Sequence, residues 1–550
     1  MDRYQLVPVG IFILSFLHST ASGQSDDGVC QLDCMFRPHP AALVDVREEP
    51  QNSLVKVEEE PEVRSKGRVL FTLWSLDEKD VEILRTFSEH LQTLGHEVTF
   101  LTHSKHRSFL QDLGPVVSFK IPPSKVCNIN ASNSPTPFRM VRNALQVPEV
   151  NCRAVLDDPT LRTWLGEQKF HAAVTDVVGN ECSLALLQAL GIPTIGFISQ
   201  PGFDFFMMAQ PPSYIPTPGT GYAGKMSFFQ RINNLVYFVT YALTVEAYHL
   251  AAYTSIVKRL PDGKHPYNLM QDLAFTFLTY DSYLDSRKRF PPNVKPIGCL
   301  HCRPARPLKE DFPKADEKPI VLLNLPQVHR TIIDQILTTT RLRNIDVALT
   351  DRTTRPNPKL RNFTIHSEDL QDLLGHDRVK LLITNCDHRD VYSALYHSVP
   401  LLCLPSDFLQ RDIAALVESR NFGVQAEKFE QWTLFRVMDE ALNNDIYSRT
   451  VRAISRRMHS RRIAGPLEVF QMWTELVIKR GNLWQLKMID YRQYRFQTYL
   501  IDAILLWVIG ITFLAYVMPS ISRRFGRLVS LLVGLTILIV GPIAILNVLT

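Results

Sequence analysis

The residues with the clearest chemical potential lie in a polar turn that follows an apolar run at 379–384. The turn begins at Asn385, and the helix expected after it carries Asp387, Arg389 and Asp390 in its first residues. Free N–H groups and the macrodipole at a helix N-terminus attract anions such as phosphate. Carboxylates in the first turn stabilise the helix, yet they occupy and neutralise the same positive end. The sequence therefore predicts an anion-binding position that the chain caps with its own acids.

A second candidate group is Cys299-Leu-His-Cys302, whose spacing is that of zinc ligands or of a redox pair. It has no second pair and no ligand cluster near it in the sequence, so a disulfide or two buried thiols is favoured and no metal is predicted. The chain has nine cysteines, an odd number, which leaves at least one unpaired within a monomer. In an oxidising compartment some of the others should form disulfides.

From residue 68 onward, short apolar runs alternate with longer amphipathic segments. A run at 69–73, helical spacing over 79–94 and a run at 97–102 form a βαβ unit, with Gly95 placed as a helix-ending glycine. A helix is also predicted over 183–190. Further strands are predicted at 172–175, 194–197, 320–324, 346–350, 379–384 and 400–404. Two sets of strands alternating with helices indicate an α/β protein with two doubly wound parallel sheets.

The predicted body has an N-terminal domain over residues 68–290, a Pro-rich linker over 291–317 and a C-terminal domain over 318–490. Ligands of open parallel sheets sit outside the carboxyl ends of the strands, so the loops that follow the strands should line a cleft between the domains. The composition is 45% hydrophobic and 21% charged, with a net charge of +5. This balance is typical of a globular protein, and no nucleic-acid partner is predicted.

The N-terminus has the pattern of a secretory signal peptide over residues 1–23. Arg3 precedes an apolar run at 9–17, and small residues stand at 21–23 where a signal peptidase cleaves. The segment at 24–67 that follows is rich in acids and poor in apolar residues. It cannot bury enough surface to offset its ordering entropy, so we expect a disordered leader there.

Two apolar runs close the chain, at 499–518 and 528–549, and each is long enough to span a bilayer. Three arginines lie between them, so this loop should face the cytosol and the body of the chain should face the lumen. If both runs span, the C-terminus returns to the lumen; if the second lies against the first, it does not. The sequons at Asn130 and Asn362 fit a lumenal glycoprotein.

Several motifs make the chain resemble the UDP-glucuronosyltransferases of the UDP-glycosyltransferase family. The motifs are Leu94-Gly-His-Glu-Val98, Pro212-Ser-Tyr-Ile-Pro216, Gly298-Cys-Leu-His-Cys-Arg-Pro-Ala-Arg-Pro-Leu308, Asp372-Leu-Leu-Gly-His376 and Tyr396-His-Ser-Val-Pro400. The resemblance covers about residues 68–518. It implies the two-domain GT-B fold, with Rossmann-like domains and a membrane anchor. It also implies a UDP-sugar donor substrate, no other cofactor, and residence in the endoplasmic reticulum membrane.

The same resemblance assigns donor-site roles to positions that have mostly changed type. The Trp that stacks on uracil corresponds to Ser367, and its neighbouring Gln corresponds to Leu370. The His-Gly-Gly turn that holds the diphosphate is replaced from Asn385 onward by Asn-Cys-Asp. The ribose-binding Glu corresponds to Ser393, and of the sugar-binding Asp-Gln pair only Gln410 remains, because Leu409 stands in place of the Asp.

These changes predict weak donor binding. Losing three good contacts at about 1–3 kcal/mol each would move a micromolar nucleotide site beyond millimolar. Arg389 could recover part of the loss by pairing with a phosphate. By contrast, the packing positions of the motif, such as Tyr392 and Pro400, are retained, so we expect the domain to fold.

On the acceptor side the family uses a His oriented by an Asp. The His position falls on Asp80, and the Asp position on Asp176. An unperturbed aspartate, with a pKa of about 3.9, is a poor base for an alcohol. Repulsion between Asp80 and Asp176 could raise that pKa and make an acid/base dyad. The alternative, which we favour, is that Asp80 caps the helix that begins there.

Three functions are consistent with the sequence. The first is a non-catalytic GT-B protein in the secretory pathway, acting as a binding or regulatory partner in a homo- or hetero-oligomer with active relatives. The second is a divergent transferase that moves a glucuronosyl or hexosyl group to a small lipophilic hydroxyl, using Asp176, Asp80, Arg389 and Gln410. The third is a structural or trafficking protein whose membrane hairpin is the functional part.

Overall fold

The computed structural model of this 550-residue chain describes most of its predicted body. The described residues are 66–73, 78–103, 107–119, 136–200, 202–208, 210–281, 285, 288–308, 318–325, 330–342, 345–350, 363–365, 368–426, 431–460, 465–487 and single residues between 505 and 516. They belong to one compact unit of the chain. Several predicted features lie outside these residues: the predicted signal peptide, the predicted leader up to residue 65, both sequons, the second apolar run and Ser367.

The first sheet has seven strands in the order β3-β2-β1-β4-β5-β6-β7, and neighbouring strands are parallel. Its strands are β1 (Arg68–Leu73), β2 (Glu97–His103), β3 (Val116–Phe119), β4 (Ala172–Asp176), β5 (Thr194–Ile198), β6 (Phe275–Leu278) and β7 (Val294–Pro296). The chain reverses direction across the sheet between β1 and β4, which is where doubly wound sheets bind ligands. Residues 294–296, which the sequence analysis places in the linker, form its edge strand.

The second sheet has six strands in the order β10-β9-β8-β11-β12-β13, again with parallel neighbours. Its strands are β8 (Ile320–Asn324), β9 (Asp346–Leu349), β10 (Phe363–Ile365), β11 (Val379–Thr384), β12 (Leu401–Cys403) and β13 (Gly423–Gln425). The order reverses between β8 and β11. The prediction of two doubly wound parallel sheets is therefore confirmed.

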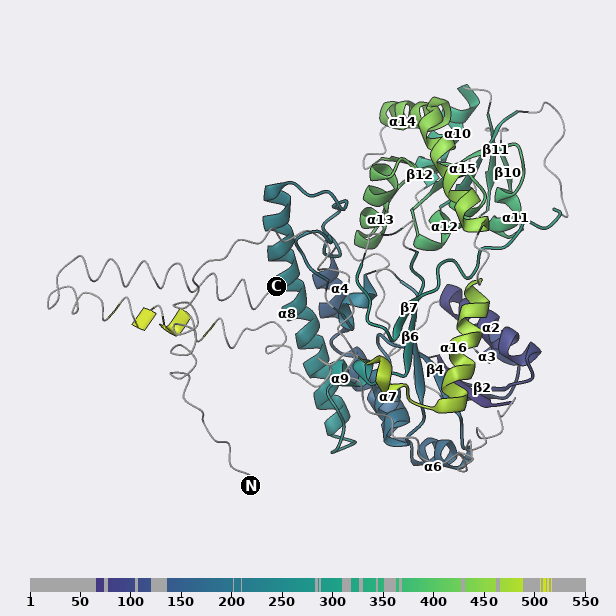
Figure 1. Ribbon diagram of the computed structural model, residues 1–550. Helices are drawn as coiled ribbons and strands as arrows, with labels where there is room; N and C mark the ends of the chain where they lie inside the picture. The colour runs from purple at the N-terminus through teal and green to yellow at the C-terminus, as the bar shows by residue number, and fades with distance from the viewer. Residues whose placement is uncertain are drawn as a thin grey trace, which may run out of the picture. The chain divides into compact units, whose positions relative to one another are not determined.

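Helices cover both faces of each sheet (Figure 1). Around the first sheet are α2 (Glu78–Thr93), α3 (Arg107–Leu110), α4 (Pro137–Ala144), α5 (Val147–Leu156), α6 (Pro159–Glu167), α7 (Glu181–Ala189), α8 (Phe228–Val257) and α9 (Pro266–Gln271). Around the second are α10 (Arg330–Leu342), α11 (Leu370–Leu374), α12 (His388–Tyr396), α13 (Phe408–Ser419), α14 (Gln431–Asn443) and α15 (Asp445–His459).

Alternate residues of the central strands supply the two cores of each sheet, as the period of two in a β-strand requires. In β1, Leu70 packs on the side of α4 to α9, whereas Val69 and Phe71 pack on the side of α2. The last helix, α16 (Pro466–Arg480), joins this second side, where Phe470 stacks on Phe87 of α2 with ring centroids 3.7 Å apart. Residues predicted within the C-terminal domain thus complete the core of the first sheet.

The predicted βαβ unit is present with small shifts at its ends. Helix α2 ends as expected, because Gly95 has a φ of 86° and the His96 N–H bonds to the carbonyl oxygen of Leu91. The prediction that Asp80 caps α2 is wrong, since the helix begins at Glu78 and Asp80 is its third residue. The Asp80 side chain lies outside the described part of the structure.

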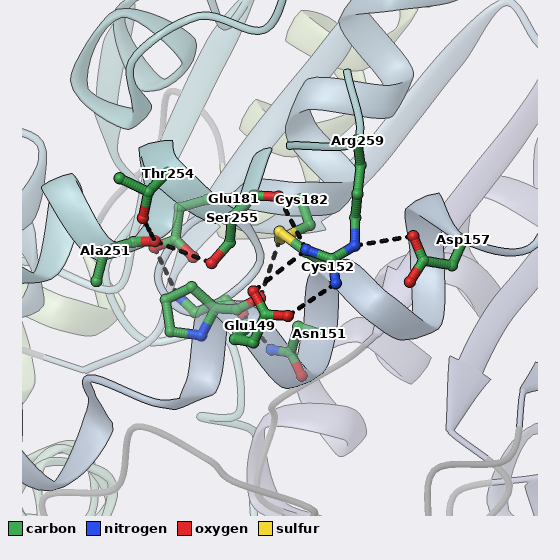
Figure 2. The surroundings of a disulfide bond; sticks show 12 residues. Glu149, Asn151, Cys152, Asp157, Glu181, Cys182, Ala251, Thr254, Ser255 and Arg259 are labelled. Carbon is green, nitrogen blue, oxygen red and sulfur yellow. Dashed lines mark hydrogen bonds and ion pairs between the residues drawn. A yellow bond between two sulfur atoms is a disulfide. The ribbon is translucent and has the colours of Figure 1, made fainter. Parts of the chain in front are cut away.

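Three disulfides join described cysteines: Cys152–Cys182, Cys299–Cys302 and Cys386–Cys403. Of the two states favoured for Cys299 and Cys302, a disulfide or two buried thiols, the structure has the disulfide. Figure 2 shows the first bridge, which ties α5 to α7 beneath α8. Beside it, Arg259, which follows α8, forms ion pairs of 2.8 Å with Glu149 of α5 and with Asp157 at the end of α5, so the end of α8 is held to α5 by charge.

Candidate functional site

The reversal point of the second sheet carries a buried carboxylate. Asp390, in the first turn of α12, accepts hydrogen bonds from Asn324 Nδ2 at 2.8 Å and from Thr384 Oγ1 at 2.5 Å. Asn324 and Thr384 are the last residues of β8 and β11, and Thr350 in turn donates to Asn324 Oδ1. Asp390 therefore fills the space between the carboxyl ends of the two central strands.

The N-terminus of α12 is capped by Asp387, as the sequence predicts. Its side chain accepts a hydrogen bond of 3.2 Å from the Arg389 N–H. A carboxylate here satisfies a free N–H group of the first turn and interacts favourably with the helix dipole. Both acids predicted to neutralise this helix end are thus held there: Asp387 by a hydrogen bond within the turn, and Asp390 by hydrogen bonds from the strand ends.

The turn before α12 keeps an unusual backbone conformation. Cys386 has a φ of 60°, a left-handed conformation that glycine adopts freely and other residues rarely. Its disulfide to Cys403 ties the turn to the end of β12. The resemblance to the UDP-glycosyltransferases assigns a glycine to this position, and the cysteine adopts the backbone shape of a glycine while adding a covalent link and a side chain.

A buried carboxylate from the first domain meets α12 from outside the second sheet. Asp285 lies between β6 and β7 and accepts hydrogen bonds from Tyr392 OH at 2.6 Å and from the Asp281 N–H at 2.8 Å. His388 Nε2 lies 3.3 Å from its other oxygen. Burial acts to raise the pKa of Asp285, but the attraction of His388 and these hydrogen bonds outweigh it, and the pKa is lowered.

This contact is reinforced on both sides. Arg420, at the end of α13, donates to the Asp285 carbonyl oxygen at 2.6 Å. His301, from the segment that leads from β7 to β8, lies with Nε2 3.0 Å from the Arg389 carbonyl oxygen. Burial lowers the pKa of His301 to about 3, so this imidazole is neutral at physiological pH. Helix α12 is therefore bound at its first turn by residues outside the second sheet.

Gln410, which the resemblance assigns to the sugar-binding pair, has local structural partners for its side chain. Its Oε1 accepts from the N–H groups of Ser406 at 2.8 Å and Asp407 at 3.3 Å, while Asp407 accepts from the Gln410 N–H at 2.8 Å. This is a capping box at the start of α13. Burial raises the pKa of Asp407 to about 6.

Helix α13 also contacts the first domain. Asp412 accepts from the N–H of Gly219 at 2.6 Å and from the N–H of Gly221 at 2.7 Å. Both glycines have positive φ, and this turn brings their two N–H groups to a single carboxylate. Next to the contact is a cavity of about 90 Å³. Its lining is mostly apolar, with Ile215, Pro218, Leu409, Ile413 and Leu416, and it also includes the charged residues Asp285, Lys288 and Asp412.

The other predicted donor-site residues lie close to α12. Asn385 is buried in the turn before it, and its Oδ1 has no hydrogen-bond partner among the described residues. Ser393 is buried between α11 and α12, where it accepts from Gln371 Nε2 at 2.6 Å and donates to the Arg389 carbonyl oxygen at 2.9 Å. The structure therefore brings Asn385, Arg389 and Ser393 together on one helix and turn, with Ser393 engaged in packing.

On the acceptor side, Asp176 is buried at the carboxyl end of β4, at the reversal point of the first sheet. Beside it, Asn180 Nδ2 donates to Thr175 Oγ1 and lies 3.5 Å from Thr72 Oγ1. The position of Asp176 suits a residue that orients an acid or base. The Asp80 side chain lies outside the described part of the structure, so the dyad of Asp80 and Asp176 stays a prediction.

A neighbouring acid is more deeply buried. Glu181, the first residue of α7, has no solvent exposure, and it accepts from the Gly179 N–H at 3.1 Å and from Tyr248 OH at 3.0 Å. Burial raises its pKa to about 7, against the effect of these hydrogen bonds. Glu181, like Asp285 and Asp412, was not predicted from the sequence. The only local signal for the Asp285 contact was the four-residue spacing of His388 and Tyr392 on one helix face.

Comparison with known families identifies sequence relatives. The sequence profile of the family described as "UDP-glucoronosyl and UDP-glucosyl transferase" matches residues 116–520. UDP-glucuronosyltransferase 2A3 of Cavia porcellus is 24% identical over 488 residues, covering 80% of this chain and 89% of that protein. UDP-glucuronosyltransferase 2B7 of Homo sapiens is 23% identical over 486 residues, with the same coverage of 80% and 89%.

Solved structures share the fold. The glycosyltransferase of kitacinnamycin superposes with a TM-score of 0.54 at 14% identity, covering 75% of this chain and 99% of that one. A UDP-glucosyltransferase from Polygonum tinctorium superposes with a TM-score of 0.52 at 15% identity, covering 76% and 99%. These likenesses establish the GT-B fold. The family profile, the long alignments and the two parallel sheets together show that this chain belongs to the UDP-glucuronosyl and UDP-glucosyl transferase family.

Proposed function

We propose that this chain is a UDP-glycosyltransferase-family protein with much weakened nucleotide-sugar binding, acting as a binding or regulatory protein. The observation that carries the proposal is the first turn of α12. A diphosphate at this position needs free N–H groups and an uncompensated dipole. Asp387 already accepts from the Arg389 N–H, and Asp390 is buried between the ends of β8 and β11.

A bound diphosphate would therefore meet two carboxylates in its own binding position. Displacing Asp387 would break its cap hydrogen bond, which costs about 1 kcal/mol, before any contact to phosphate forms. Asp390 is held by two hydrogen bonds from residues that do not belong to its helix. Repulsion between the phosphate and both acids adds to this cost.

The sugar side of the pocket supports the same proposal. Gln410 is engaged with the N–H groups of Ser406 and Asp407, so its use as a sugar ligand would require the capping box to open. Leu409, in place of the family Asp, lines the apolar cavity and offers no hydrogen bond to a hydroxyl group.

The second candidate function is a divergent transferase that passes a glucuronosyl or hexosyl group from a UDP-sugar to a small lipophilic hydroxyl. It is favoured by Asp176, which keeps the family's residue type at the reversal point of the first sheet. It is also favoured by the apolar cavity beside α13, whose lining suits a lipophilic molecule. In this function Arg389 would take over part of the phosphate binding.

The proposed cellular location and partners of the protein rest on its family membership and on the predicted membrane anchors. We infer a lumenal body in the endoplasmic reticulum membrane and an oligomer with itself or with active relatives. Among the described residues, one helix, α8, is long and apolar enough to cross a membrane, with 28% of its most apolar window buried.

A transfer assay tests the proposal. The full chain in detergent micelles is given millimolar UDP-glucuronic acid, UDP-glucose or UDP-galactose with a panel of phenols and steroids, and released UDP is measured. UDP-glucuronosyltransferase 2B7 serves as the positive control. We expect no release above background. Turnover that disappears in Asp176→Asn would overturn the proposal and establish the transferase instead.

A further inference from the structure

Helix α8 carries an apolar stripe on its outer side. Eight large apolar side chains are exposed along its length: Phe228, Phe229, Ile232, Leu235, Val236, Val239, Leu243 and Leu250. Their spacing of three, four and seven residues places them on one face of the helix. At 1.5 Å per residue, the 30 residues of α8 extend about 45 Å. A contiguous exposed apolar surface of this length marks a contact with a partner or a membrane.

The opposite face of α8 is fixed to the protein. Its buried side chains include Asn234, Tyr241, Tyr248 and His249, and the helix packs against α4, α5, α7 and α9. The Asn234 side chain donates to the carbonyl oxygens of Pro212 and Ile215. A helix held on one side by protein along its length cannot be surrounded by lipid. The apolar stripe can only meet a surface that lies along the helix.

The exit of the chain from its folded body places such a surface nearby. Lys487 is the last residue of the continuous described body, and its Nζ donates to the Asp272 carbonyl oxygen at 2.9 Å. Asp272 ends α9, which packs on α8. The first predicted membrane span starts at residue 499, only twelve residues later. Even fully extended, that length reaches no more than about 40 Å, so a bilayer holding the span stays within reach of α8.

Charge is arranged at the ends of the stripe. Lys225 and Arg231 are exposed near the start of α8, and Lys258 is exposed at its end. Within the 30 residues of the helix, Glu246 is the one acid and Arg231 the one lysine or arginine. Apolar side chains on one face with cations beside them are typical of helices that lie in the interface of anionic bilayers.

We propose that α8 lies on the lumenal surface of the bilayer that anchors the chain, with its stripe from Phe228 to Leu250 inserted among the phospholipid acyl chains. The predicted span supplies the tether, and a tethered surface is met at high effective concentration. Asn234 of α8 is hydrogen-bonded to the segment at 212–222, which faces α13. Lipid contact along α8 would therefore hold this segment beside the membrane. A lipophilic molecule could then enter the apolar cavity from the bilayer.

Photo-crosslinking of the full chain in phosphatidylcholine–phosphatidylserine liposomes tests this proposal. A carbonate wash first confirms that the chain stays with the liposomes. p-Benzoylphenylalanine then replaces Leu243, which is 67% exposed on the stripe, or Met472, which is 55% exposed on α16. Helices α8 and α16 pack on opposite faces of the first sheet, so Met472 is a matched apolar control (Figure 1).

We expect phospholipid adducts at position 243 to exceed those at position 472 at least tenfold. Adding Ile232→Asp and Leu235→Asp should remove most adducts at 243 without lowering the unfolding midpoint, because both side chains are exposed. Equal adducts at the two positions, adducts mainly to a second copy of the chain, or adducts at 243 that persist with the aspartates would each overturn the proposal.

Discussion

The substitution Glu181→Gln should change how the stability of the first domain depends on pH. Glu181 is fully buried between the Gly179 N–H and Tyr248 OH, and its pKa in the folded protein is about 7 rather than 4.5. Below about pH 4.5 the carboxyl group is protonated in both the folded and the unfolded chain. As the pH rises from about 4.5 to about 7, the unfolded chain loses this proton while the folded chain keeps it, so the folded state is progressively disfavoured.

The size of the effect follows from the pKa difference. At 1.36 kcal/mol per pKa unit, a rise from 4.5 to about 7 corresponds to roughly 3 kcal/mol of stability lost between pH 4.5 and pH 8. For a domain of this size, that is on the order of 6–12 °C in the unfolding midpoint. A glutamine keeps an acceptor for the Gly179 N–H and cannot ionise. Its presence should remove this part of the pH dependence.

The assay is thermal unfolding of the full chain in detergent at pH 5 and pH 8, followed by tryptophan fluorescence. Between pH 5 and pH 8, the unfolding midpoint of the wild type should fall further than that of Glu181→Gln. Glu149→Gln is the control of opposite sign, because the hydrogen bond from Arg259 lowers the pKa of Glu149 to about 2. The stabilisation by the Glu149–Arg259 ion pair weakens only below about pH 4.5. Glu149→Gln should therefore change the unfolding midpoint by the same amount at pH 5 and pH 8. Parallel behaviour of the wild type and Glu181→Gln would refute the reasoning.

Three further variants test the contacts around α12 and α13. Asp285→Asn should lower the unfolding midpoint by the equivalent of about 3 kcal/mol, because it leaves His388 without its carboxylate. Since the pKa of Asp285 is lowered in the folded protein, the stability difference between the wild type and this variant should shrink as the pH falls below about 4. A midpoint unchanged at pH 7 would contradict this. Cys386→Ser together with Cys403→Ser should cost about 2–4 kcal/mol in denaturant unfolding. Reduction of the wild type opens all three described disulfides and should cost at least as much. A double variant as stable as the wild type would show that the bridge is dispensable. Asp412→Asn replaces one of the two oxygens that accept N–H groups from the glycine turn, so limited proteolysis at residues 217–222 should become several-fold faster. Cleavage rates equal to the wild type would count against the contact.

The sheets could be predicted because their strands are short apolar runs bounded by turns. The strands at 320–324 and 379–384 were located to the residue, and Gly95 marked the end of α2 by the left-handed conformation it adopts. Helix α8 was missed. Helix α8 buries the polar residues Asn234 and His249 and exposes the apolar residues Phe229 and Leu243. The apolar residues therefore do not mark the buried face, which is the pattern used to predict a helix that packs on a core.

The candidate site was predictable only where the chemistry is local. The cap at Asp387 could be predicted because a helix N-terminus and its capping residue are adjacent in the chain. Asp285 could not, since its meeting with His388 and Tyr392 spans more than one hundred residues and depends on how the domains pack. The buried state of Glu181 likewise depends on α8, which covers α7.

Equilibrium binding of UDP to the full chain tests the central claim most directly. Isothermal titration calorimetry in detergent micelles, with UDP-glucuronosyltransferase 2B7 as the positive control, should give no saturable heat below about 1 mM. A double variant, Asp387→Asn with Asp390→Asn, should bind UDP more tightly than the wild type, because the two competing charges are gone. A micromolar Kd for the wild type, weakened by Arg389→Ala, would contradict the account.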